Sequence, residues 1–121
     1  MVDYAYTARA SFDSSHRVPG YPGCDYPHGH TWNVAVTVTG ALEPDENDIR
    51  RVNLSEDIVY DLTLVIDEID GRDLDAMLPG ISTIPEGVAA WILERLPVAD
   101  QVEVEMGWRR VTGLARRNKK R

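Results

Sequence analysis

The sequence of 121 residues has a single cysteine, Cys24, and no long run of apolar residues. One cysteine cannot form a disulfide within the chain, which favours a reducing compartment, and we expect the cytoplasm. Without 18 consecutive apolar residues, no membrane span is expected. The N-terminus has no basic segment followed by an apolar one, so the sequence predicts no secretory signal.

The net charge of −7 is unevenly distributed along the chain. Residues 109–121 contain seven basic side chains and no acidic one, whereas the remainder is strongly acidic. A short basic tail can bind nucleic acid, or it can be solvated and rest on an acidic neighbouring subunit. Because the body is acidic, nucleic acid is not expected as the main partner. The length and ordinary composition predict one domain over residues 1–115, followed by a basic tail, 116–121.

Two segments alternate between apolar and polar residues, as expected for strands with one buried face. The first covers residues 3–16 and the second covers residues 28–39. Between them, residues 17–27 contain three prolines and two glycines and are expected to form a loop. The two strands are therefore predicted to pair in an antiparallel arrangement.

Residues 40–52 contain turn-forming residues and predict a turn or a hairpin extension. Apolar residues then recur at helical spacing near 54–69, with Asn53 and Glu56 as the start signal. The connection that follows has room for a short helical turn around residues 74–78.

A second helix is predicted to begin with a capping box of Thr83 and Glu86 and to end before Pro97. Alternation predicts two further strands at residues 101–106 and 108–115. The order ββααββ indicates an α+β fold, with a four-stranded antiparallel sheet and two helices on one face. Four strands leave two open edges, which favours pairing with other subunits.

All three histidines of the chain lie in the first two strands, next to the loop. Residues two apart on a strand point the same way, roughly 6–7 Å apart, so His28 and His30 converge. An antiparallel neighbour lies about 5 Å away, which allows His16 to supply a third ligand. Three neutral imidazoles suit zinc and leave a fourth position for water or substrate, as in catalytic sites. The alternative is three ordinary core or loop histidines, but their gathering in one segment favours a metal.

Cys24 lies in the loop, four residues before His28. Near a cation, its thiol would ionise more readily, which favours a chemical role. The alternative is an inert, buried cysteine.

These residues form two motifs, Phe12-x-x-Ser15-His16 and Cys24-x-x-x-His28-Gly29-His30. Together they resemble the 6-pyruvoyltetrahydropterin synthase and 6-carboxytetrahydropterin synthase family. The ββααββ order is similar to the tunnelling fold of that family. The resemblance covers nearly the whole chain and is strongest over residues 12–39.

The resemblance implies a zinc ion (Zn²⁺) held by the three histidines and a pterin substrate, 7,8-dihydroneopterin triphosphate, whose side-chain oxygens bind the metal. It implies that Cys24 acts as a general base, assisted by an Asp–His pair whose aspartate is Asp70. Glu86 and a glutamate on the third strand, Glu105, would hold the pterin edge through charge-assisted hydrogen bonds. It also implies a homo-oligomer in which trimers close the sheets into a barrel and stack in pairs as hexamers.

The chain departs from the family pattern at several places, and two of these concern the proton relay and the contact to the pterin. The histidine that follows Asp70 in the family is Gly71 here, in a segment that continues to Asp75 where the family has Asn. On the third strand, strict alternation puts Met106 where the family has its pterin-anchoring glutamate. Glu105 would then face the opposite side, unless a bulge turns it.

The resemblance implies a 6-carboxytetrahydropterin synthase-like lyase in deazapurine (queuosine-type) biosynthesis. The alternative is a zinc-containing protein that binds a pterin or purine with altered or no catalysis, because the catalytic histidine of the family is Gly71. A nucleic-acid binder acting through the basic tail is the least favoured hypothesis.

Overall fold

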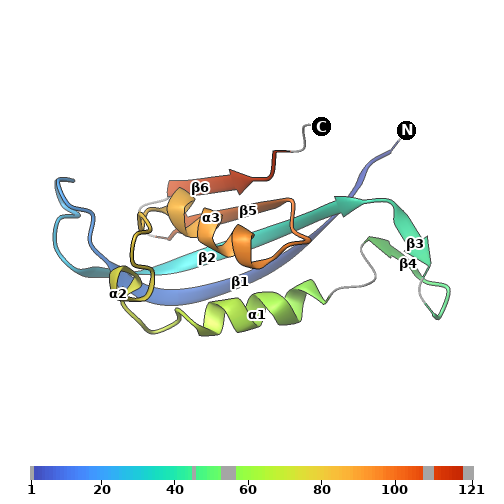
Figure 1. Cartoon of the computed structure of the whole chain (residues 1–121), viewed down its shortest axis with the longest axis horizontal. Coiled ribbons are helices and arrows are strands. Elements are labelled where there is room, and N and C mark those ends of the chain that lie inside the picture. The colour runs from blue at the N-terminus through green and yellow to red at the C-terminus, as the bar shows by residue number, and fades with distance from the viewer. Residues whose placement is uncertain (1, 45, 53–56, 108–110, 119–121) are drawn as a thin grey trace.

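In the computed structural model, the described residues form a four-stranded sheet built on a long β-hairpin, a separate two-stranded sheet and three helices (Figure 1). The structure describes residues 2–44, 46–52, 57–107 and 111–118. The elements, in chain order, are β1 (Tyr4–His16), β2 (His28–Gly40), β3 (Leu42–Pro44), β4 (Arg50–Val52), α1 (Ile58–Asp67), α2 (Leu74–Met77), α3 (Pro85–Arg95), β5 (Gln101–Met106) and β6 (Val111–Arg116).

The predicted four-stranded antiparallel sheet is confirmed, with the strand order β1-β2-β5-β6. Alternation in the sequence located both long strands, because one face of each is buried against the helices. The register of the hairpin pairs Tyr4 with Gly40 at one end and His16 with His28 at the other. The histidines of the two strands therefore meet at the end of the sheet that carries the 17–27 loop.

Helices α1 and α3 cover one face of the sheet and leave the opposite face open (Figure 1). Large aliphatic and aromatic side chains from both layers form the core, and burial of this apolar surface is the main stabilising contribution. Its fully buried side chains include Trp32, Val36, Val102 and Val104 from the sheet and Ile58, Leu62, Val88 and Ile92 from the helices. No helix among the described residues is long and apolar enough to cross a membrane.

The 40–52 segment forms a separate two-stranded sheet of β3 and β4, as the predicted hairpin extension implied. The predicted helical turn is present as α2. Helix α1 begins at Ile58, where the side chain of Asp57 accepts a hydrogen bond from the Tyr60 amide. The start signal at Asn53 and Glu56 lies outside the described residues.

Two local predictions are wrong. The N-cap of α3 is Ile84, without a side-chain capping bond, because the Thr83 hydroxyl instead donates to Asp75 at 2.6 Å. The edge of β1 is not open along its whole length, since the 71–72 segment bonds to it. The Gly71 amide donates to the Asp13 carbonyl at 2.6 Å, and the Ser15 amide donates to the Arg72 carbonyl at 3.1 Å.

Part of the predicted basic tail belongs to the folded body. Arg116 is the last residue of β6. The Arg117 guanidinium donates to the carbonyls of Leu93, Leu96 and Ala99 at 2.7, 3.2 and 2.8 Å, so it caps the end of α3. Residues 119–121 lie outside the described residues.

Close packing of α3 on β6 depends on Gly113. A Cβ added there would lie 2.1 Å from the Glu86 nitrogen and 2.4 Å from the Pro85 carbonyl carbon, which are backbone atoms that cannot rotate away. We expect Gly113→Ala to destabilise the fold by roughly 1–3 kcal/mol, as overpacking does. Chemical denaturation measures this, with Gly40→Ala as control, because its Cβ would make only an ordinary 3.7 Å contact with Val52. Equal stability of both variants would contradict the prediction.

Candidate metal centre

The three histidines come together where β1 ends and β2 begins. His16 is paired with His28, and Ser14 is paired with His30, so the register of the hairpin alone brings the rings into one group. Their ring centroids are 4.6–4.9 Å apart. One nitrogen from each ring lies within 4.8 Å of the others, in a group that could hold a metal ion. The sequence-based expectation that the rings converge is therefore met.

Two of the rings are held in one tautomer by backbone carbonyls. The Nδ1 of His16 donates to the Thr83 carbonyl at 2.5 Å, and the Nδ1 of His28 donates to the Tyr26 carbonyl at 2.6 Å. A carbonyl oxygen can only accept, so each Nδ1 carries the proton and each Nε2 presents a lone pair. This is the outer hydrogen bond that metal-ligating histidines usually make.

The Nε2 atoms of His16 and His28 fit a metal for a second reason. Both are buried, and neither has a hydrogen-bond partner within the part of the chain that the structure describes. A buried polar atom without a partner costs about 1–3 kcal/mol. A bound cation would remove this cost, so the donor set of three imidazoles fits zinc.

Trp32 forms the floor beneath the histidines. Its side chain is fully buried, and its ring centroid is 4.9 Å from that of His16 and 5.6 Å from that of His30. The indole nitrogen donates to the Ser14 carbonyl at 3.1 Å, and Phe12 stacks against the ring. The buried rings of Phe12 and Trp32 form this floor, and they limit the freedom of the His16 and His30 imidazoles to turn away.

Burial lowers the pKa of His16 below its ordinary value of 6.5, because the imidazolium would lose its hydration. The hydrogen bond to Thr83 acts in the opposite direction, repulsion from His28 adds to the lowering, and the carboxylates of Asp75 and Asp73 oppose it. His16 is therefore neutral near pH 7, which is the form that binds a metal.

The metal-free protein should lose stability as the pH falls below 6.5. Because the pKa of His16 is lowered in the folded state, the unfolded chain binds this proton at a higher pH than the folded chain does. The free energy of unfolding should therefore decrease from 6.5 toward the folded-state pKa. Denaturant unfolding at about pH 7.5 and about pH 5.5 measures this, and His16→Gln should show a smaller decrease. Equal decreases in both proteins would contradict the prediction.

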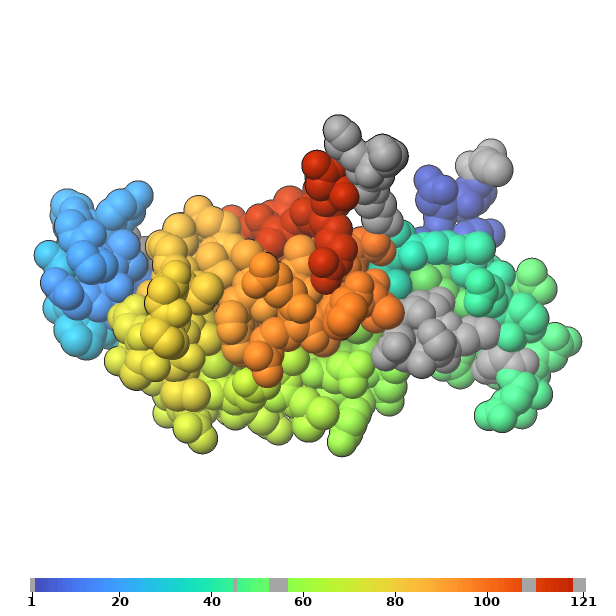
Figure 2. Space-filling view, in the orientation of Figure 1, coloured from blue at the N-terminus to red at the C-terminus, as the bar shows by residue number. Residues whose placement is uncertain are grey.

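Cys24 is buried within the loop that joins the two histidine strands. Its carbonyl accepts from the Val18 amide at 2.8 Å, and its amide donates to the Tyr21 carbonyl at 2.9 Å. An ion pair of 2.8 Å between Arg17 and Asp25 fastens the two sides of the loop. The loop forms one end of the molecule (Figure 2). It is therefore a folded segment, which holds the thiol at the histidine end of the sheet.

Asp70 and Gly71 lie beside β1, next to Asp13. The carboxylate of Asp70 accepts from the Asp13 amide at 3.0 Å. Gly71 has a φ of +73°, and a Cβ added there would meet no heavy atom within 4 Å. The position that holds a histidine in the family thus has open space around it and a backbone conformation that glycine favours.

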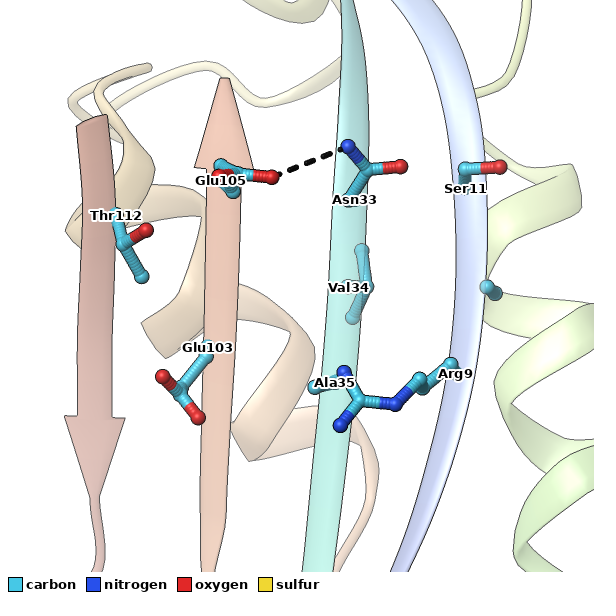
Figure 3. Close-up of a pocket in the computed structure, with 9 residues that line it drawn as sticks. Arg9, Ser11, Asn33, Val34, Ala35, Glu103, Glu105 and Thr112 are labelled. Atoms are coloured by element: carbon cyan, nitrogen blue, oxygen red, sulfur yellow. Dashed lines mark hydrogen bonds between the residues drawn. The ribbon is translucent and has the colours of Figure 1, made fainter. Parts of the chain in front are cut away.

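Glu105 and Met106 face opposite sides of the sheet, as the strict alternation predicts. Met106 is buried and paired with Trp32, on the histidine side. Glu105 accepts from the Asn33 amide nitrogen at 3.3 Å on the open face, where the residues in Figure 3 line a cavity of about 610 Å³. The β2–β5 register is continuous from Trp32 to Thr37, so no bulge turns Glu105. Within one chain, Glu105 does not lie on the same side of the sheet as the histidines.

Glu86 is exposed in the first turn of α3. A carboxylate there is favoured by the helix dipole, and this structural role is compatible with the predicted contact to a substrate.

The sequence did not identify Thr83 and Asp75 as part of this centre. The sequence predicts Thr83 as part of a capping box, and nothing in the sequence indicates that its carbonyl holds His16. Both residues line a cavity of about 470 Å³ together with Arg17.

Known proteins share this fold and part of this sequence. The model of the 6-pyruvoyl tetrahydropterin synthase family matches residues 5–112. The structure of 6-pyruvoyl tetrahydropterin synthase from Caenorhabditis elegans has a TM-score of 0.75 and 20% identity, over 98% of each chain. The corresponding Plasmodium falciparum enzyme has a TM-score of 0.67 and 14% identity, over 95% of this chain and 98% of that one.

An uncharacterised protein from Wolinella succinogenes has a TM-score of 0.69 and 14% identity, over 98% of this chain and 100% of that one. At such identities, the likeness to solved structures concerns the fold. No curated protein gives a significant match.

Proposed function

The chain belongs to the 6-pyruvoyl tetrahydropterin synthase family, and on this premise we propose that it is a zinc-dependent lyase of the 6-carboxytetrahydropterin synthase type. Its substrates would be 7,8-dihydroneopterin triphosphate and one water molecule, and its products 6-carboxytetrahydropterin, acetaldehyde and triphosphate, on a route to deazapurines such as queuosine. The observation that carries the proposal is the pair of buried, unpartnered Nε2 atoms of His16 and His28 beside His30. The compact loops, which resemble bacterial-type members, favour the carboxy product.

In this proposal, His16, His28 and His30 hold zinc and leave one position for substrate oxygens. When bound, zinc supplies a Lewis acid that makes the C–H groups of the substrate side chain more acidic. The hydrogen bonds from the Nδ1 atoms to carbonyls keep two of the imidazoles oriented, with the proton on Nδ1. Cys24, as a thiolate, would accept a proton from the substrate. With glycine at position 71, Asp70 has no imidazole beside it in the chain, so Cys24 carries more of this proton transfer.

Glu86 and Glu105 are proposed to bind the pterin edge, where a carboxylate can accept two charge-assisted hydrogen bonds. Because Glu105 faces the open side of the sheet, it would reach a pterin only in a pocket that another copy of the chain completes. A homo-oligomer, as trimer or hexamer, is proposed for this reason, and the polar open face would then line the inside of a barrel. The single cysteine supports a cytoplasmic location.

A second candidate function is binding of a pterin or purine at the zinc centre without turnover. Gly71 favours it, because a general acid or base typically contributes 10²- to 10⁴-fold to a rate, and this position carries no side chain. The absence of a histidine at position 71 would leave the three zinc-binding histidines in place, so the affinity for a pterin would remain.

Turnover by the zinc-loaded protein distinguishes the two candidates. We expect release of acetaldehyde from 7,8-dihydroneopterin triphosphate, and we expect Cys24→Ala to reduce it by at least about 100-fold, the lower end of what a general base contributes. Equilibrium dialysis with the same pterin measures binding in parallel. Tight binding without acetaldehyde would favour the second candidate, and equal turnover by Cys24→Ala would remove Cys24 from the mechanism.

A further inference from the structure

The hydrogen bonds around His16 continue outward to Asp75. The Thr83 carbonyl accepts the Nδ1 proton of His16 at 2.5 Å, and the Thr83 hydroxyl donates to the Asp75 carboxylate at 2.6 Å. The second carboxylate oxygen of Asp75 accepts from the Arg17 amide at 2.7 Å. Asp75 therefore joins the residue that directly follows His16 to the residue whose carbonyl orients the His16 ring.

The three residues around His16 come from segments that are distant in sequence. Thr83 lies 67 residues after His16, in the connection between α2 and α3. Asp75 is in the first turn of α2, where Asp73 caps its amide and the neighbouring Leu74 is fully buried in the core. Because α2 is anchored in this way, the Asp75 carboxylate is a fixed point to which both the end of β1 and the Thr83 segment are attached.

We propose that Asp75 is a positioning residue for the metal ligand His16. By holding the Thr83 carbonyl against the end of β1, it keeps the His16 ring turned so that Nε2 points toward His28 and His30. The inference rests on the proposed function, in that it takes the three histidines as the zinc ligands. Asp75 itself touches neither the metal position nor a substrate in this assignment, and it acts through Thr83.

Geometry, not charge, carries this role. Asp75 is exposed to solvent, which screens its charge. An asparagine at position 75 could make the same two bonds, because its amide oxygen accepts from the Arg17 amide and its amide nitrogen donates to the Thr83 hydroxyl, which can also accept. An alanine could make neither bond. The two substitutions therefore separate the positioning effect from a charge effect.

The affinity for zinc, measured by competition with a chromophoric chelator, tests the proposal. We expect Asp75→Ala to weaken zinc binding by at least about 10-fold, as loss of a group that orients a ligand does, and to change the visible spectrum of the cobalt-substituted protein. Asp75→Asn should remain within about 3-fold of the parent protein, well below that loss. Thr83→Val and Thr83→Ser form a second pair, in which only serine keeps the hydroxyl.

Asp100 provides a matched control at the far end of the sheet. Its carboxylate also accepts from one backbone amide and one threonine hydroxyl, those of Thr39, at 2.6 and 2.8 Å. Asp100→Ala removes the same kinds of bond without touching the histidine end, so it should lower stability and leave the zinc affinity and the cobalt spectrum unchanged.

The outcomes separate this proposal from the proposed function. If the parent protein binds no zinc, both fail. If it binds zinc and Asp75→Ala and Thr83→Val bind it equally well, the positioning role is wrong and the zinc centre stands. If Asp75→Asn is as weak as Asp75→Ala, the charge of Asp75 is what matters, and the positioning role is again wrong.

Discussion

Replacing His28 by alanine should lower the affinity for zinc by more than about 100-fold. Loss of a group that merely orients a ligand costs 10–100-fold, and loss of the ligand itself should exceed this. His28 is the ligand to change first because it is only half-buried, whereas His16 and His30 are buried and their removal would also disturb the core. Metal analysis after dialysis, together with chelator competition, measures the effect.

The effect of zinc on thermal stability gives a second measurement on the same variant. Zinc at about 100 times its dissociation constant should stabilise the parent protein by about 2.7 kcal/mol, because a ligand that binds only the folded state shifts the unfolding equilibrium. His28→Ala should lose this zinc-dependent increase in Tm. Thr37→Ala, on the same strand but far from the histidines, should keep it. A parent protein whose Tm and metal content do not respond to zinc would refute the metal centre.

Replacing Gly71 by histidine should raise turnover by about 100-fold, at the lower end of what general acid–base catalysis contributes. The position follows Asp70, and a Cβ added there meets no heavy atom within 4 Å, so the new side chain has space. The φ of +73° should lower the free energy of unfolding of any variant with an L-residue at this position, by roughly 1–2 kcal/mol. This cost affects folding, whereas the imidazole acts on the rate of the folded protein. Acetaldehyde release by zinc-loaded protein is the measurement.

Gly71→Ala is the matched control for this gain. It carries the same backbone strain as Gly71→His but brings no imidazole, so its turnover should not rise. If both variants fold, bind zinc and react at the same rate as the parent protein, the missing histidine is not what limits this chain. Binding of pterin without turnover by every variant would support the second candidate function.

The sequence predicted much of the centre because its signals are local. Alternation with a period of two assigned His28 and His30 to one face of a strand, and the apolar parity of His16 assigned it to the same layer. The same alternation placed Met106 inward and Glu105 outward, and the structure follows it. The motif around Cys24 led to the family that the comparison with known sequences then confirmed.

Other parts of the centre could not be predicted because they depend on contacts between distant segments. Thr83 looked like a helix cap, since the sequence holds a threonine three residues before a glutamate. In the folded chain, Thr83 lies against the end of β1 and against α2, so its hydroxyl bonds to Asp75 and its carbonyl to His16. Arg117 looked like part of a solvated tail, and instead it caps α3.

By itself, the sequence determined the four strands of the main sheet and the two long helices, which of their faces are buried, and that three imidazoles lie on one of those faces. These are consequences of the periodicity of side chains along a single segment. Only the tertiary structure decided that two carbonyls set the tautomers of His16 and His28 and that Asp75 supports one of them. Such features depend on which backbone atoms meet across the fold. The periodicity of side chains along one segment does not predict where the carbonyls of a distant segment will lie.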